Sequence, residues 1–413
     1  MFVIYQQENQ RVPVKVWLKE QSELEPECQG QAMHLANLPF AFKHVALMPD
    51  THTGYGMPIG GVLATDGVII PNAVGVDIGC GMGFVHTNIP ASILKTVDTS
   101  SGKLARQITG AIMREVPVGF AHHKEAQACA ALDLFQPEHL DDQITAELLE
   151  EIEAGYYQVG TLGGGNHFIE LQEDEAGHLS IMLHSGSRNF GYKICRYFNQ
   201  RAKELNRDWF ASVLPQWDLA FLPVDSPAGQ AYIEWMNLAL DFAKENRQLM
   251  MERVKNLVFN CVKKYAGITG IEVDLEVNAH HNYAAIENHF GRNVWVHRKG
   301  AIRAREEEWG IIPGAMGSYS YIVKGLGNPE SFQSCSHGAG RKMGRKEAER
   351  QFRYEDVLED LQRQEITLGT PNRSKITDEC RWAYKEIDQV IANESDLVEP
   401  VMKVKTVAVI KAS

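Results

Sequence analysis

A histidine in a glycine-rich loop is the residue of this chain best suited to covalent chemistry on phosphate. Residues 334–341 read Ser-Cys-Ser-His-Gly-Ala-Gly-Arg, with His337 followed by two closely spaced glycines. Glycine lets the backbone approach a ligand closely, and a neutral imidazole is a good nucleophile towards phosphorus. Arg341 and Arg345 lie one turn apart if a helix begins there. The segment therefore predicts a phosphate-binding loop with His337 as its nucleophile.

A second glycine-rich turn places a carboxylate and a thiol together. Residues 75–83 read Gly-Val-Asp-Ile-Gly-Cys-Gly-Met-Gly, so Asp77 and Cys80 are three residues apart. A hard oxygen beside a soft sulfur suits a borderline divalent ion such as Mn, Zn, Co or Fe. A structural turn with a buried cysteine is the alternative interpretation.

Histidines follow or end three further segments that have the character of strands. His167 comes after a Gly-Gly-Gly-Asn turn, His184 precedes Ser-Gly-Ser-Arg, and His281 is the second of two adjacent histidines. A single histidine of this kind is more often a satisfied core residue than a ligand. Asn166 could bind a phosphate oxygen or a water on a second metal, and Arg188 could hold a phosphate. Taken together, one Asp, one Cys and three His could form a two-metal site with a shared thiolate.

Local patterns predict the elements that carry these groups. Apolar, β-branched segments bounded by glycine or proline predict strands at 44–48 and 67–70, and segments that end at glycine turns predict strands at 167–171 and 179–184. Period-two alternation predicts a strand at 271–277, and 404–410 is also strand-like. Helical spacing predicts helices at about 91–114, 124–157, 229–265, 341–353 and 384–393. Strands and helices mix without strict alternation, which favours an α+β fold of packed sheets surrounded by helices. With no linker evident, residues 1–413 are expected to form a single domain.

Composition limits the cellular context. The N-terminus has no basic region followed by a long apolar segment, and no apolar stretch is long enough to span a membrane. The seven cysteines are scattered, odd in number and without a C-x-x-C pair. Free thiols in a reducing compartment are therefore expected, and with them a cytoplasmic location.

The formal net charge of −12 argues against a general electrostatic grip on nucleic acid but allows a local basic groove. One basic cluster contains Arg298, Lys299, Arg303 and Arg305, and a second covers residues 341–353. Each cluster could be a strip for a nucleic-acid backbone or simply a solvated face. The common nucleotide-binding loops are missing, since no G-x-x-x-x-G-K-[ST] or G-x-G-x-x-G motif occurs.

Together these motifs resemble the RtcB family of RNA-splicing ligases. The resemblance extends from Pro49-Asp-Thr-His-Thr-Gly-Tyr-Gly-Met-Pro-Ile-Gly-Gly to Lys411 and includes seven or more motifs in the family's order. The family joins an RNA 3′-phosphate or 2′,3′-cyclic phosphate to a 5′-hydroxyl, using GTP and Mn²⁺. The resemblance thus implies a GTP- and Mn-dependent RNA ligase with two Mn²⁺ ions, acting in RNA repair or tRNA splicing. It leaves open whether an archease-type activator is needed.

The resemblance also implies residue roles. The metal ligands would be Asp77, Cys80, His167, His184 and His281, and His337 would carry GMP as a phosphoramidate. Contacts to the guanylate would come from Asn166, His167, Phe168, Ile169, Glu170, His281, Asn282, Pro313, Gly314, Ala315, Met316, Ser320, His337, Gly338, Ala339, Gly340, Tyr384 and Lys411. RNA phosphates would contact Arg188, Arg341 and Arg345.

Several positions depart from the family pattern. Ala315 stands where the family usually has serine, which removes a potential hydrogen bond to the guanylate phosphate. Asn189 stands where glycine is common, and asparagine tolerates a left-handed backbone better than most residues. The stretch before Tyr384 and the C-terminal tail also lack the expected prolines. These changes suggest a divergent paralogue specialised for RNA repair.

Two other functions remain open at this point. The altered positions would fit a metal-dependent cyclic phosphodiesterase that acts on RNA ends with weak or no ligation. A non-catalytic RNA-binding factor on the same fold is the third possibility, and the intact ligand set argues against it.

Overall fold

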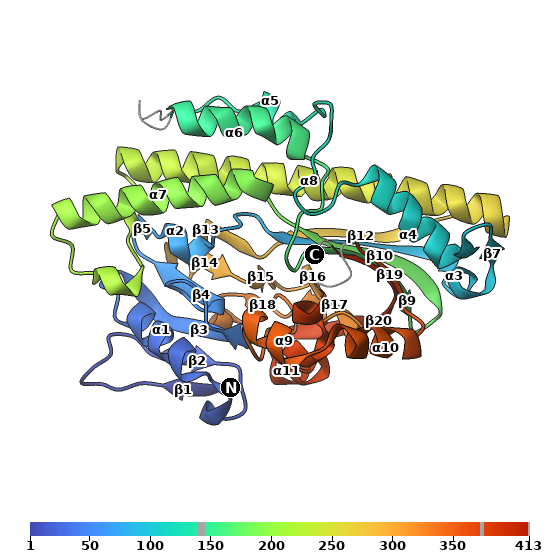
Figure 1. The fold of residues 1–413 in the computed structure, drawn as a ribbon. Helices are drawn as coiled ribbons and strands as arrows, with labels where there is room; N and C mark the ends of the chain where they lie inside the picture. The colour runs from blue at the N-terminus through green and yellow to red at the C-terminus, as the bar shows by residue number, and fades with distance from the viewer. Residues whose placement is uncertain (139–144, 372–375, 412–413) are drawn as a thin grey trace.

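The computed structural model describes residues 1–138, 145–371 and 376–411 of this α+β protein, whose two main sheets carry helices around them (Figure 1). The six-stranded sheet has the order β1 (Phe2–Ile4), β2 (Val14–Val16), β3 (Ala41–His52), β4 (Ile59–Thr65), β14 (Arg292–Lys299) and β13 (Asn282–His289). Short two-stranded ladders pair β5 (Val68–Ile69) with β11 (Leu222–Pro223), β7 (Asp98–Thr99) with β8 (Gly102–Lys103), and β15 (Ala301–Arg303) with β18 (Ser334–Ser336).

The second sheet is curled until its edges meet. Its order is β12 (Val273–His280), β6 (Gly81–Pro90), β10 (His178–Ser185), β9 (Phe168–Asp174), β20 (Val398–Lys411), β17 (Tyr319–Gly325) and β16 (Trp309–Ile312), with β19 (Thr367–Gly369) parallel to β20. Strands β12 and β16, at opposite ends of this order, contact each other. The sheet is therefore nearly closed.

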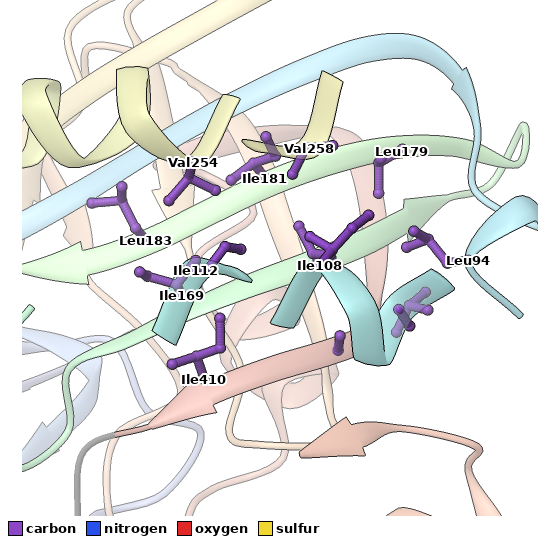
Figure 2. Packing of buried hydrophobic residues seen from close by; sticks show 14 of the residues in the cluster. Leu94, Ile108, Ile112, Ile169, Leu179, Ile181, Leu183, Val254, Val258 and Ile410 are labelled. Carbon is purple, nitrogen blue, oxygen red and sulfur yellow. The ribbon is translucent and has the colours of Figure 1, made fainter. Parts of the chain in front are cut away.

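Helices cover one face of the curled sheet. They include α4 (Leu104–Glu115) and α8 (Pro227–Ala266), and α7 (Arg188–Asp208) lies beside α8 (Figure 1). Figure 2 shows Ile108 and Val254 from these helices over Ile181 and Leu183 of β10. Successive side chains of a strand point to opposite faces, so Met182 belongs to a different cluster, with Phe84 on the other face. That face carries the candidate site.

Both ends of the long helix α8 are capped. Its N-cap Ser226 accepts a hydrogen bond from the Gly229 N–H at 3.1 Å, and Pro227 occupies the first helical position. The helix ends at Gly267, whose φ of 68° is left-handed. The remaining α-helices of the described residues are α1 (Pro26–Ala36), α2 (Pro71–Val74), α3 (Ile93–Thr96), α5 (Ala130–Asp133), α6 (Thr145–Gln158), α9 (Arg345–Gln351), α10 (Tyr354–Arg363) and α11 (Ile387–Asn393).

The predicted strands are confirmed, whereas several predicted helices are wrong in extent. The helix predicted over 91–114 is interrupted by the β7–β8 hairpin, and the one predicted over 124–157 is divided between α5 and α6, with part of it outside the described residues. The helix predicted over 341–353 begins only at Arg345, so Arg341 is not one helical turn from it. Helix α7 was not predicted. Among the described residues, no helix is both long and apolar enough to cross a membrane.

Candidate metal and nucleotide site

Four strands of the curled sheet bring the predicted metal ligands together. Cys80 directly precedes β6, His167 precedes β9, His184 lies near the end of β10, and His281 follows β12. These four strands are neighbours in the order β12, β6, β10 and β9, and each pair of neighbours is antiparallel. The strand ends that carry the four residues therefore lie side by side at the same end of the sheet. The alternation along β10 points His184 away from the helices that cover Leu183 (Figure 2).

The ligand atoms are close to one another. The Cys80 Sγ lies 3.2 Å from His184 Nε2 and 3.5 Å from His167 Nε2. His184 Nε2 lies 3.3 Å from His281 Nε2, and His167 Nε2 lies 3.2 Å from a carboxylate oxygen of Asp77. Metal–nitrogen bonds of about 2.0–2.1 Å and metal–sulfur bonds of about 2.3 Å give separations of this size between ligands.

These five residues form two overlapping triads. One is Cys80, His184 and His281, the other is Asp77, Cys80 and His167, and Cys80 belongs to both. A thiolate with nitrogen and oxygen donors fits borderline divalent ions, and a shared thiolate allows two of them. The donor set therefore fits the implied two-metal centre.

Burial also suits these groups to a metal. Burial lowers the pKa of both His184 and His281 well below the ordinary value, which keeps the imidazoles neutral. Burial alone would raise the pKa of Asp77. The hydrogen bond with His167 and the electrostatic attraction between the two side chains instead hold that pKa at about 2. Burial and Asp77 raise the pKa of the Cys80 thiol, and a bound cation would reverse that effect because a coordinating thiol is deprotonated.

Arg247 of α8 joins the loops that carry these ligands, and the sequence patterns did not predict this role. Its guanidinium is buried and donates to the carbonyls of Gly79 at 2.7 Å and Ser185 at 3.0 Å. It also donates to Nδ1 of His280 at 3.0 Å. Those three residues are sequence neighbours of Cys80, His184 and His281. One side chain thus fixes three ligand loops, and His280 has the structural role in the histidine pair.

His337 lies beside this cluster and is oriented by Asp50. The ring N–H of His337 donates from Nδ1 to Asp50 Oδ2 at 2.6 Å, and its backbone N–H donates to the same oxygen at 3.0 Å. In the neutral imidazole the second ring nitrogen, Nε2, then carries the lone pair. The rings of His337 and His281 have centroids 4.8 Å apart. Sequence patterns predicted His337 as the nucleophile but assigned no role to Asp50.

A glycine makes room for the His337 ring. Gly300 has a φ of 62°, and a Cβ at this position would lie 2.9 Å from His337 Cε1 and 2.4 Å from Ile59 Cγ2. Real Cβ atoms do not approach other atoms this closely, so a larger residue would displace the imidazole.

A cavity opens beside His337. Residues predicted to bind the guanylate line it from several segments, namely Asn166, Phe168, Glu170, Pro313, Gly314, Ala315, Met316, His337, Gly338, Ala339, Gly340, Tyr384 and Lys411. His184 and four further polar residues, His52, Arg341, Arg345 and Glu379, also face it. The cavity thus adjoins both the metal ligands and His337.

Glu379 organises the cationic side of the cavity, and no sequence pattern had singled it out. Its carboxylate accepts from Lys411 at 2.6 Å, from the Tyr384 hydroxyl at 2.7 Å and from Arg341 at 3.2 Å. Burial would raise the pKa of Glu379, but Lys411, Arg345 and Arg341 hold it at about 2. The carboxylate is therefore ionised and keeps the cations in place.

Comparison with known proteins agrees with these motifs and this geometry. The family model described as tRNA-splicing ligase RtcB matches residues 31–412. The chain belongs to the RtcB family. It is 39% identical to the RNA-splicing ligase RtcB of Escherichia coli K12, over 97% of this chain and 98% of the relative. It is 32% identical to the tRNA-splicing ligase RtcB of Methanococcus maripaludis, over 97% and 95% of the two chains.

Some residues assigned through the RtcB resemblance do not line the cavity. The Ile169 side chain lies on the opposite face of β9, in the cluster that contains Ile112 and Leu183 (Figure 2). Ser320 instead accepts a hydrogen bond from the Gly314 N–H at 3.1 Å and so shapes the loop. Asn282 donates to the Asp77 carbonyl at 3.1 Å and accepts from the Gly300 N–H at 2.8 Å.

The arginines assigned to RNA phosphates differ in exposure. Arg188 is largely enclosed, and donates to Thr161 Oγ1 at 3.0 Å and to the Gly119 carbonyl at 3.2 Å. Arg341 bonds to Glu379, whereas Arg345 is 47% exposed and lies 3.9 Å from the same carboxylate. The sequence predicted a left-handed backbone at Asn189. In the structure Arg188 has the left-handed conformation instead, with a φ of 59°.

Two of the four members of the first basic cluster do not lie on a surface strip of the kind that the RtcB resemblance suggested. Arg298 is fully buried and forms an ion pair with Glu287 at 2.6 Å. Lys299 is buried and donates to the carbonyls of Tyr55 and Asn72 at 2.5 and 3.0 Å. Both cations sit inside the fold because buried acceptors satisfy them, which charge counting along a sequence does not detect.

Proposed function

We propose that this protein joins RNA 3′-phosphate or 2′,3′-cyclic phosphate ends to 5′-hydroxyl ends, using GTP and two Mn²⁺ ions, with His337 as the guanylate carrier. Membership of the RtcB family makes the protein an RNA ligase. The end chemistry, the nucleotide, the metal and the residue roles are our proposal.

The observation that carries this proposal is the arrangement of one imidazole. His337 has its Nδ1–H held by Asp50 at 2.6 Å, so Nε2 keeps the lone pair that a nucleophile needs. This imidazole lies beside His281 of the five-residue cluster and lines a cavity with four cationic or hydroxyl-bearing side chains, namely Arg341, Arg345, Tyr384 and Lys411. A triphosphate needs positive charge of this kind around it.

The proposed steps follow from these positions. His337 Nε2 attacks the α-phosphorus of GTP, so a nitrogen–phosphorus bond forms and pyrophosphate leaves. The guanylate then passes to the RNA 3′-phosphate, which restores the imidazole. The 5′-hydroxyl attacks the activated 3′-phosphate, GMP leaves, and a phosphodiester bond remains. Asp50 stabilises the charge on the imidazole while it is bonded to phosphorus.

The metal centre has a separate part in this proposal. Asp77, Cys80, His167, His184 and His281 would hold the ions, which supply positive charge against developing phosphate charge when bound. The choice of Mn²⁺ follows the family resemblance, since the donor set also suits Zn²⁺ or Co²⁺.

The test is Mn²⁺-dependent transfer of α-labelled GMP from GTP to the protein. The wild type should acquire an acid-labile label and His337→Ala should not, with metal content equal in the two proteins. His122→Ala, which changes an exposed histidine, is the matched control and should label fully. A label of wild-type extent on His337→Ala would overturn the role of His337.

One observation favours a second function. Ala315 lines the cavity where the family usually has a serine, so one hydroxyl that could contact a phosphate is absent. A metal-dependent cyclic phosphodiesterase with weak ligation would open a 2′,3′-cyclic phosphate without GTP and yield no joined RNA. GTP-dependent joining of the same ends would exclude it.

We further propose that residues 1–413 act as a single domain in the cytoplasm. All seven cysteines lie in described segments and none forms a disulfide, which supports a reducing compartment. An archease-type activator belongs to the same proposal, and its test is the ligation rate with and without such a protein.

A further inference from the structure

A second group of metal-binding side chains lies away from the candidate active site. His86 Nε2 is 3.0 Å from Asp174 Oδ2, and His178 Nδ1 is 3.6 Å from the same oxygen. The ligand atoms of the three residues all lie within 4.8 Å of one another. We name His86, Asp174, His178 and the adjacent Asp274 the distal cluster.

We propose that the distal cluster binds one divalent transition-metal ion of the Zn²⁺ type. Two imidazoles and one carboxylate are a common ligand set for Zn²⁺. Tetrahedral ligands about 2.0–2.2 Å from a metal lie roughly 3.3–3.6 Å apart. The two distances to Asp174 are already close to this value, and a modest approach of the two imidazoles would complete the triad.

The second ring nitrogen of His86 strengthens this proposal. Its Nδ1 lies 2.6 Å from Asp274 Oδ1, so a carboxylate holds the side of the ring that faces away from the triad. Histidines that bind metals usually donate their other N–H to such a carboxylate, which fixes both tautomer and ring orientation. The arrangement leaves Nε2 of His86 as the ligand atom directed at Asp174.

Asp174 is likewise held in place. Its other oxygen, Oδ1, accepts the backbone N–H groups of Ala176 at 3.0 Å and His178 at 2.6 Å. Only Oδ2 therefore points to the imidazoles. The Asp174 side chain is 7% exposed and that of His178 is 42% exposed. The cluster thus has a buried carboxylate and a side open to water, which can admit an ion and complete its coordination.

The distal cluster lies on the same strands as the candidate active site. His86 is on β6, Asp174 ends β9, His178 begins β10, and Asp274 lies near the start of β12. The other ends of these strands carry Cys80, His167, His184 and His281. His86 pairs with Ser180, four residues from His184 on β10, which is about 14 Å along a strand. An ion here would fix the register of the strands that deliver the first metal centre.

The test uses Co²⁺ and Zn²⁺ on the full chain. Co²⁺ at the first centre should produce a thiolate-to-metal charge-transfer band from Cys80, whereas Co²⁺ at the distal cluster should produce only ligand-field bands. His178→Ala should bind one ion fewer per chain than the wild type by equilibrium dialysis, with the thiolate band unchanged. His122→Ala, an exposed histidine elsewhere, should bind as the wild type does.

A second variant keeps the test independent of folding defects. Asp274→Asn retains all three ligands, its side chain is 67% exposed, and it should weaken Zn²⁺ at the distal cluster by about 10- to 100-fold. Equal ion numbers in the wild type and His178→Ala, with equal Zn²⁺ affinity in Asp274→Asn, would overturn the proposal. The cluster would then serve only to hydrogen-bond His86 between the carboxylates of Asp174 and Asp274.

Discussion

Asp50 Oδ2 accepts two hydrogen bonds from His337, one from the ring at 2.6 Å and one from the backbone at 3.0 Å. The two residues are 287 positions apart in the chain. Asp50 is completely buried, and its other oxygen, Oδ1, has no hydrogen-bond partner among the described residues. A buried carboxylate with this geometry sets the tautomer of its histidine.

Replacing Asp50 should therefore reduce guanylylation without removing the metals. Asp50→Asn offers a neutral amide to His337 Nδ1, so the imidazole loses its fixed tautomer and the stabilisation of its charge. We expect the rate of GMP transfer from labelled GTP to fall on the order of 10²- to 10⁴-fold, with Mn²⁺ content unchanged. The exposed Asp66→Asn should transfer GMP at the wild-type rate. An unaltered rate in Asp50→Asn would refute the positioning role.

A methyl group at Gly300 should displace the nucleophile. The added Cβ would lie 2.9 Å from the His337 ring, so Gly300→Ala should lose most GMP transfer. Gly291→Ala is the matched control, because Gly291 also has a positive φ, of 78°, but has open space around its Cβ position. Both variants should lose about 1 kcal/mol of stability from the left-handed backbone. Equal activity in the two would contradict the steric argument.

Arg247 should control the affinity for metal. Arg247→Met removes the side chain that links the loops preceding Cys80 and His281, and we expect Mn²⁺ to bind about 10- to 100-fold more weakly. Isothermal titration with Mn²⁺ measures this. Arg253→Met, on the same helix α8 but bonded to Gln127 and the Gly160 carbonyl, should leave the affinity unchanged. Equal affinity for Mn²⁺ in both variants would rule out the role of Arg247.

Glu394 should make stability depend on pH. Burial, with Asp50 and Asp396 adding repulsion, raises its pKa from 4.5 to about 8 while it accepts hydrogen bonds from Ser336. Because the folded-state pKa lies above the unfolded value, the stabilisation is complete below pH 4.5 and is lost as pH rises to about 8. Through Glu394, the free energy of unfolding should fall by at most about 1.4 kcal/mol per pH unit.

Urea unfolding from pH 4.5 to 8 measures that slope. Glu394→Gln cannot ionise, so its free energy of unfolding should vary less with pH than that of the wild type. Glu8→Gln, which changes an exposed glutamate, should retain the wild-type slope. Identical slopes in Glu394→Gln and the wild type would mean that Glu394 does not hold a proton in the folded state.

Restoring a hydroxyl at position 315 should improve nucleotide capture. Ala315→Ser places a donor in the wall of the cavity, and one hydrogen bond contributes about 0.5–1.5 kcal/mol. The KM for GTP in the labelling reaction should fall by a corresponding factor of roughly 2 to 12. Ala315→Gly, which adds no hydroxyl, should show no such gain. An unchanged KM for GTP in Ala315→Ser would mean that the GTP phosphates do not bind next to residue 315.

The sequence by itself determined the strands and the ligand types. Alternating or continuous apolar segments predicted β9, β10 and β12, because side-chain periodicity is a local property of the chain. His337, Cys80 and the three histidines could be selected because each lies at a strand end or in a glycine turn. Helix boundaries were predicted less well, since the β7–β8 hairpin and the start of α9 depend on packing that local spacing does not record.

Only the tertiary structure decided which residues act on one another. Asp50 lies in a motif that gave it no role, Arg247 and Glu379 lie in no motif, and each became significant through partners distant in sequence. Burial likewise turned Arg298 from a surface cation into an internal ion pair. The physical reason is that hydrogen-bond geometry and desolvation depend on positions in space, whereas a sequence pattern reports only what one segment favours by itself.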